Sequence, residues 1–92
     1  MTDALAVCRC DIDAIDDALV ALLARRFAVV DRVIAHKLSA DLPAAIPERI
    51  AEVVARVRAK AKTQGLSPVV AENLWRQLIS ETIAYERQKR VA

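Results

Sequence analysis

The sequence is poor in turn-forming and aromatic residues. One glycine and three prolines occur in 92 residues, and aromatic residues make up 3% of the chain. This composition leaves little turn chemistry for a sheet protein and favours a few long helices. It also leaves almost no aromatic platforms on which single-stranded nucleic acid could stack. We therefore predict an all-α protein that does not bind RNA.

The sequence also offers little for metal binding, secretion or membrane insertion. Cys8 and Cys10 are the only cysteines. Their spacing places them on different faces of a helix and matches no zinc or redox motif, so we expect free thiols and no metal. Charged residues are scattered through the first twenty positions, which argues against a signal peptide or a membrane span and predicts a cytoplasmic protein. These residues are Asp3, Arg9, Asp11, Asp13, Asp16 and Asp17.

The charge balance gives no broad electrostatic surface for DNA or anionic lipid. The net charge is +2, from 14 basic and 12 acidic residues. A partner that binds through charge must therefore contact a small cluster of charged residues and not a broad charged surface. A chain of this length suits one domain, residues 1–92, so an active site must come from one small core or from several copies.

The remaining residues predict three helices. No glycine or proline interrupts residues 3–39, and apolar residues recur there at intervals of three and four. Pro43 and Pro47 bracket a loop, a second helix is expected over residues 47–64, and Gly65 suits its C-terminal cap. Ser67 and Pro68 suit the start of a third helix, to about residue 88, before a frayed basic tail. The expected inward residues of the last two helices are Ile50, Val53, Val54, Val57, Leu74, Trp75, Leu78 and Ile79.

The first predicted helix is too long for its neighbours to cover. At 1.5 Å per residue it spans roughly 50 to 55 Å, against about 25 to 33 Å for the other two. An apolar stripe that extends beyond its own chain's helices stays exposed unless a second copy covers it. We therefore predict a symmetric homodimer with intertwined first helices.

Several charged residues fall on or beside apolar helix faces. Arg26 and Lys37 lie near the centre of the stripe of the first helix, where an unpaired cation costs several kcal/mol or more. No acid of that helix shares the stripe centre, so a ligand carboxylate is the simplest partner; the alternatives are snorkelling or an acid from another helix. Arg9, at the stripe edge, could reach a partner's pocket in a dimer. Arg49 borders the second helix's stripe, a place equally natural for a solvated arginine.

The third predicted helix carries a hydroxyl and a carboxyl on its apolar side. Thr82 and Glu86 are one turn apart and share a face with Leu78 and Ile79. Burial and neighbouring cations act in opposite directions on the protonation of such a carboxyl, so its charge state stays open. Acids in such surroundings often mark functional sites.

Taken in order, these positions form a distinctive set. It consists of Arg9 with Ile12, Ile15 and Asp16, then residues 22–26, Lys37, residues 47–49, residues 65–66 and residues 75–86. Over nearly the whole chain this set resembles the all-helical AroQ-type chorismate mutases, including their relatives the isochorismate-pyruvate lyases. The resemblance implies an intertwined dimer that needs no cofactor and converts chorismate to prephenate in aromatic amino-acid biosynthesis.

The resemblance also implies roles for individual residues. Arg26 and Arg9 of the partner subunit would hold the two substrate carboxylates, and Lys37 would contact the ether oxygen and a carboxylate. Arg49 would stand at the pocket, Thr82 where the family often has a small hydroxyl residue, and Glu86 where it often has a glutamine that donates to the ether oxygen. The residues expected to be catalytic are Lys37, Glu86 and Arg26.

Two positions depart from the mutase pattern. Ile46 and Ile50 fall where many mutases have acidic residues that contact the ring hydroxyl of the substrate. An isochorismate-pyruvate lyase making salicylate, or an enzyme acting on 4-amino-4-deoxychorismate, therefore stays open. A noncatalytic helical dimerisation module is a third interpretation. The apolar interface of a coiled-coil dimer, however, tolerates few charges such as Arg26, Lys37 and Glu86.

Overall fold

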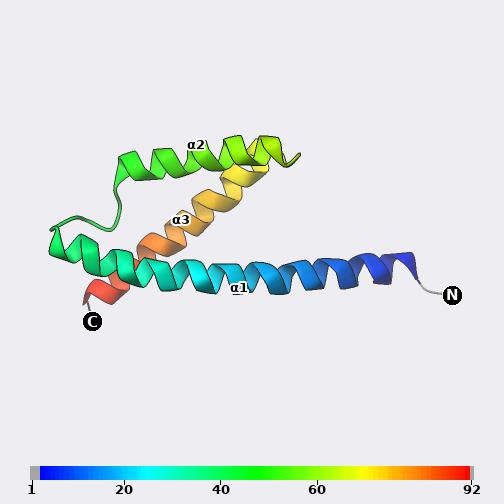
Figure 1. Ribbon diagram of the computed structural model, residues 1–92, viewed down its shortest axis with the longest axis horizontal. Helices are drawn as coiled ribbons and strands as arrows, with labels where there is room; N and C mark the ends of the chain where they lie inside the picture. The colour runs from blue at the N-terminus through cyan, green and yellow to red at the C-terminus, as the bar shows by residue number, and fades with distance from the viewer. Residues whose placement is uncertain (1–2, 92) are drawn as a thin grey trace.

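The computed structural model describes residues 3–91 and contains three helices in that range (Figure 1). They are α1 (Ala4–Ser39), α2 (Pro47–Thr63) and α3 (Pro68–Val91). No strand occurs among these residues, so the predictions of an all-α fold and of a long first helix are confirmed. No helix in this part of the chain combines the length and apolar character needed to cross a membrane.

Capping residues mark the start of α1, the end of α2 and the start of α3. Asp3 caps α1, because its carboxylate accepts a hydrogen bond from the Leu5 amide at 3.0 Å. After α2 the chain turns at Gly65, whose φ of 73° suits a residue without a side chain, and the Leu66 amide bonds back to the Ala61 carbonyl. The Ser67 hydroxyl then accepts from the Val70 amide at the start of α3. Proline and glycine therefore set both ends of α2 and the start of α3, almost as predicted.

The end of α3 differs from the prediction. The basic tail was expected to fray after residue 88, but α3 continues to Val91. Arg90 is only partly exposed, and its Nε and one terminal nitrogen are buried without a hydrogen-bond partner among the described residues. The side chain therefore packs against the protein, and this packing favours a further helical turn over a frayed end.

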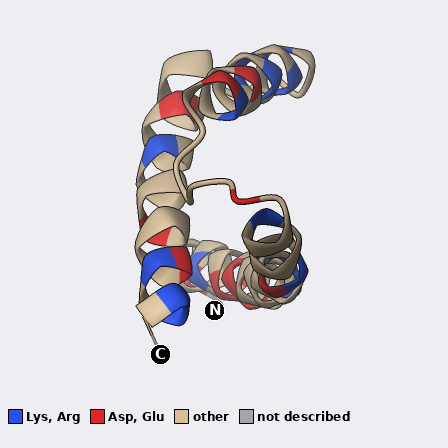
Figure 2. Cartoon of the chain, turned by 90° about the vertical axis from the view of Figure 1, so that its left-hand side faces the viewer, with Lys and Arg blue, Asp and Glu red and all other residues tan. Residues whose placement is uncertain are grey.

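The helix α3 joins the other two. It packs extensively on α2 and crosses α1 obliquely, whereas α1 and α2 make no close backbone approach within residues 3–91. In Figure 1, α1 and α2 run in opposite directions, and in Figure 2, which looks along them, α3 spans the distance between the two. The residues that carry a pocket are therefore positioned mainly through α3.

The buried core is small. It contains Val30, Ile34, Ala44, Val54, Ala61, Ala71, Thr82 and Glu86. Leu74 was expected to face inward but is 59% exposed, because no other helix of the described chain covers that side of α3. A helical period identifies an apolar face, but it does not tell whether the same chain covers it.

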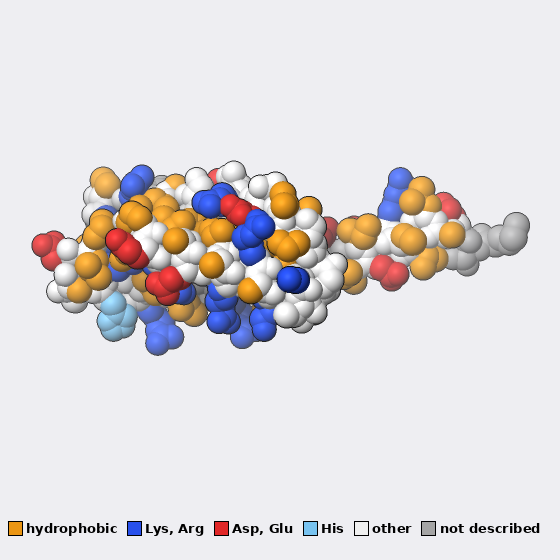
Figure 3. Space-filling view, turned by 90° about the horizontal axis from the view of Figure 1, so that it is seen from above, with side chains coloured by type: hydrophobic (Ala, Val, Ile, Leu, Met, Phe, Trp, Pro, Cys, Tyr) orange, Lys and Arg blue, Asp and Glu red, His pale blue; other side chains and the backbone are white. Residues whose placement is uncertain are grey.

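The first half of α1 projects as an uncovered arm. Every residue from 4 to 25 is exposed, and apolar side chains lie along the narrow arm in Figure 3. The large apolar residues exposed there are Leu5, Val7, Ile12, Ile15, Leu19, Val20, Leu22 and Leu23. The other helices of the chain thus do not cover this part of α1, as we expected from the length of the helix.

A three-residue ion network ties α2 to α3. Glu72 accepts from Arg58 of α2 at 2.7 Å and from Arg76 of α3 at 2.7 Å. The hydrogen bonds from Arg76 and Arg58 lower the pKa of Glu72 from its ordinary value of 4.5. The ionised carboxylate therefore stabilises the folded state above that ordinary value, and this stabilisation is lost as the pH falls through the lowered pKa.

We expect Glu72→Gln to lower the melting temperature at pH 7 by about 2 to 4 °C, a modest effect because the network is largely at the surface. The difference between variant and wild type should shrink as the pH falls well below 4.5, where both proteins lack the carboxylate charge. Circular dichroism melts at several pH values measure this difference. Glu81→Gln is a matched control on α3, since among residues 3–91 the Glu81 carboxylate accepts only from Gln77. A pH-independent difference for Glu72→Gln would contradict the prediction.

Candidate active site

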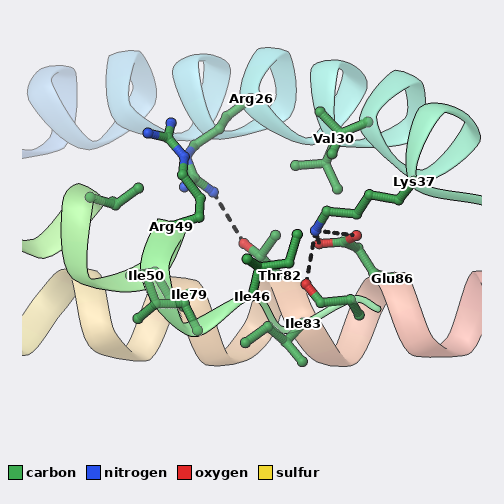
Figure 4. A pocket seen from close by; sticks show the side chains of 13 residues that line it. Arg26, Val30, Lys37, Ile46, Arg49, Ile50, Ile79, Thr82, Ile83 and Glu86 are labelled. Carbon is green, nitrogen blue, oxygen red and sulfur yellow. Dashed lines mark hydrogen bonds and ion pairs between the residues drawn. The ribbon is translucent and has the colours of Figure 1, made fainter. Parts of the chain in front are cut away.

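The three helices and the loop before α2 enclose a pocket (Figure 4). Its cavity volume is about 170 Å³. Most of the wall is apolar, and five polar side chains face it: Arg26, Lys37, Arg49, Thr82 and Glu86. The apolar lining residues are Val30, Val33, Ala44, Ile46, Ile50, Val53, Ile79 and Ile83. An apolar pocket with a few convergent polar groups is the usual form of a small-molecule site.

Arg26 presents a cation to this pocket from the middle of α1. One terminal nitrogen donates to Thr82 Oγ1 at 3.1 Å, and that hydroxyl donates to the Leu78 carbonyl at 2.8 Å. Burial lowers the pKa of Arg26, and the nearby charge of Arg49 lowers it further. No carboxylate of the described residues forms an ion pair with Arg26. Its guanidinium thus retains donors that suit an anion.

Lys37 and Glu86 form an ion pair at the other end of the pocket. Lys37 Nζ lies 3.1 and 3.3 Å from the two Glu86 carboxylate oxygens, and it also donates to the Ala44 carbonyl at 2.8 Å. The side chains of Lys37 and Glu86 are only 16% and 4% exposed. Of the partners that the sequence left open for Lys37, the structure shows an acid from another helix.

Arg49 stands at the pocket mouth. Its side chain is 65% exposed and lies 3.7 Å from the Glu52 carboxylate, one turn along α2. Such an exposed pair contributes little to stability. Arg49 therefore combines a solvated position with a place in the pocket lining, two possibilities that the sequence left open.

Arg9 is not part of the pocket of its own chain. It is exposed on the arm of α1. Arg26 follows it by seventeen positions in the same helix, which corresponds to about 25 Å along the helix axis. Arg9 therefore cannot reach this pocket without a second chain.

Two lining groups escaped the sequence analysis. Ile83 follows Ile79 by one helical turn, so the helical period could have identified it. The Ala44 carbonyl, which accepts from Lys37, belongs to the loop, and a pattern of side chains does not predict a backbone acceptor. Among residues 3–91, no three His, Cys, Asp or Glu side chains lie close enough together to hold a metal ion.

Comparison with known proteins identifies the family. The family model described as chorismate mutase type II matches residues 8–87, which include all six residues singled out from the sequence as site residues. None of the curated proteins searched matches the chain. Since the family model covers most of the sequence, and the fold is all-helical with a long first helix, the chain belongs to the chorismate mutase type II family.

Proposed function

We propose that this protein is a chorismate mutase, which rearranges chorismate to prephenate for aromatic amino-acid biosynthesis. One observation carries the proposal. Three cations and one carboxylate face a largely apolar pocket, so the lining has an excess of two positive charges. Lys37 pairs with Glu86, and the exposed Arg49 pairs with Glu52 outside the lining, whereas Arg26 has no carboxylate partner among the described residues. A ring-bearing dicarboxylate complements such a pocket in both charge and apolar surface. Membership of the family supports the same substrate class.

The proposed reaction makes modest chemical demands on the protein. In chorismate, the C–O bond of the enolpyruvyl ether breaks while a C–C bond forms in the same step, so no nucleophile and no cofactor are needed. Holding the enolpyruvyl group over the ring lowers the entropic barrier. Donors placed at the ether oxygen stabilise the negative charge that develops as the C–O bond lengthens.

In this proposal each polar group of the pocket contributes to binding or to the reaction. Arg26 binds one substrate carboxylate, and Thr82 orients Arg26 through their hydrogen bond. Lys37 donates to the ether oxygen and a carboxylate, while Glu86 donates to the ether oxygen when protonated. Arg49 draws the anion in at the mouth, where it is mostly exposed.

We further propose that the protein acts as a homodimer, with Arg9 of the partner subunit binding the second carboxylate. The exposed apolar residues of the arm support this, because a single chain leaves them in water. The position of Arg9, about 25 Å along α1 from Arg26, is consistent with a residue that serves a second chain.

An isochorismate-pyruvate lyase is the second candidate, and a specific feature favours it. Ile46 and Ile50 are apolar, and no carboxylate of α2 lines the pocket, so none there is available to a ring hydroxyl. The deciding experiment incubates the purified protein with chorismate and, separately, with isochorismate, and identifies products by chromatography. Prephenate from chorismate supports the mutase, whereas salicylate and pyruvate from isochorismate alone support the lyase. A folded protein that converts neither would contradict both.

We expect Glu86→Gln to keep or raise kcat/KM for chorismate at about pH 7. The ionised carboxylate of Glu86 can only accept, whereas the amide of glutamine can donate to the ether oxygen. The substitution also frees Lys37 from the ion pair, so that Lys37 can donate to the substrate. Steady-state kinetics of the two proteins with chorismate measure the ratio. A fall of about tenfold or more in kcat/KM for Glu86→Gln would contradict the role of Glu86.

A further inference from the structure

A second set of contacts joins α1 to α3 beside the pocket. The Tyr85 hydroxyl donates to Asp31 Oδ1. The ring of Tyr85 meets that of Phe27 edge-on, with centroids 5.0 Å apart, and Lys89 Nζ lies 5.4 Å from the Tyr85 centroid. None of these four residues lines the pocket. The hydrogen bond to Asp31 raises the pKa of Tyr85, so the hydroxyl keeps its proton at neutral pH.

This contact lies next to the proposed catalytic residues in the sequence. Tyr85 directly precedes Glu86, and Asp31 lies between Arg26 and Lys37 on α1. Within residues 3–91, α1 and α3 share three polar side-chain contacts: Arg26 with Thr82, Lys37 with Glu86, and Asp31 with Tyr85. The first two belong to the pocket, where a bound dicarboxylate competes for the same donors. Only the third is independent of what the pocket holds.

The helix α1 has few contacts that fix its position within the described chain. It crosses α3 over a short length and makes no close backbone approach to α2 in the described chain. A shift of α1 along α3 would move Arg26 and Lys37 together relative to Thr82 and Glu86. Displacements of about 1 Å at reacting groups can lower a rate by as much as two orders of magnitude.

We propose that the Asp31–Tyr85 hydrogen bond is a positioning contact, which keeps α1 in register on α3 while the substrate takes over the donors of Arg26 and Lys37. The inference rests on the proposed function for its kinetic effect. Asp31 and Tyr85 themselves touch no substrate, so they act through the residues next to them.

The experiment is a double-mutant cycle with steady-state kinetics. Tyr85→Phe keeps the ring contacts with Phe27 and Lys89 and removes only the hydroxyl. We expect kcat to fall about tenfold, KM to change less than about twofold, and the melting temperature to stay nearly unchanged. Asp31→Ala should give the same loss, and the double variant no further loss, because both changes remove one interaction. Asp31→Asn should restore kcat, since its amide oxygen still accepts from Tyr85.

Arg32→Ala is the matched control: Arg32 is exposed beside Asp31 on α1 and lies outside the pocket lining, so its loss should leave kcat unchanged. A wild-type kcat for Tyr85→Phe, additive losses in the double variant, or a lowered melting temperature with unchanged kcat would each overturn the proposal.

A second measurement separates this proposal from the proposed function. If the wild-type protein converts neither chorismate nor isochorismate, the function fails and the contact is tested by amide hydrogen exchange of residues 27–37. Tyr85→Phe should then speed exchange there several-fold relative to Arg32→Ala, because α1 is held less firmly on α3. Equal exchange in the two variants would overturn the positioning role as well.

Discussion

Replacing Lys37 by alanine is expected to lower kcat for chorismate by about two to three orders of magnitude while the chain remains helical. The proposed reason is the loss of the donor that faces the ether oxygen, and removal of one preorganised donor of this kind typically has an effect of that size. The structure adds a second consequence, because Glu86 is only 4% exposed and Lys37 is its ion-pair partner. A buried carboxylate that loses its partner destabilises the fold unless it takes up a proton.

The double variant Lys37→Ala with Glu86→Gln separates these two effects. It contains no unpaired buried carboxylate, so its melting temperature should exceed that of Lys37→Ala, whereas its kcat should stay low. Circular dichroism melts and a prephenate assay measure the two quantities. Activity near that of the wild type in Lys37→Ala would contradict the assignment of Lys37.

Mixing two inactive variants is expected to restore activity if the pocket is shared between chains. Arg9→Ala removes the residue proposed to cross the interface, and Lys37→Ala inactivates the pocket of its own chain. In a mixed dimer, the pocket of the Arg9→Ala chain keeps its own Lys37 and receives an intact Arg9 from the Lys37→Ala chain, so that pocket is complete. Random exchange of subunits should therefore give about one quarter of the wild-type activity from two nearly inactive proteins.

The control is a mixture of Arg26→Ala with Lys37→Ala. Arg26 and Lys37 of each proposed pocket come from the same chain, so every mixed dimer keeps one defect in each pocket and should stay inactive. Sedimentation equilibrium at micromolar concentration should show a dimer for all the variants. No recovery for the first mixture, despite demonstrated exchange of subunits, would contradict a contribution of Arg9 across the interface.

The helices could be predicted from the sequence because local chemistry sets their boundaries. Pro47, Gly65 and Pro68 restrict the backbone whatever surrounds them, and α2 and α3 begin or end beside them. The helical period also places Arg26, Lys37, Thr82 and Glu86 on apolar faces, and all four line the pocket. A polar residue on such a face is an informative signal, because burying it carries a large free-energy cost.

Other features depend on contacts between distant segments, which a periodic pattern does not encode. The pairing of Lys37 with Glu86 requires the crossing of α1 on α3. The contribution of the Ala44 carbonyl requires the path of the loop, and the exposure of Leu74 requires knowing where the other helices stop. The partial burial of Arg90 that accompanies the extra turn of α3 is likewise a tertiary effect.

The distribution of burial has a consequence for how this protein tolerates sequence change. Glu86 and Thr82 are 3% and 9% exposed, as shielded as Val30 and Val54. Replacing Lys37 and Glu86 together by apolar residues of similar volume would remove two charges that are costly to bury, so selection for thermal stability alone should favour this paired change. Replacing Glu86 alone would instead leave the largely buried Lys37 cation without its partner. Libraries screened for stability should therefore lose Lys37 and Glu86 together, and retention of the pair under selection for growth would show that it contributes to function.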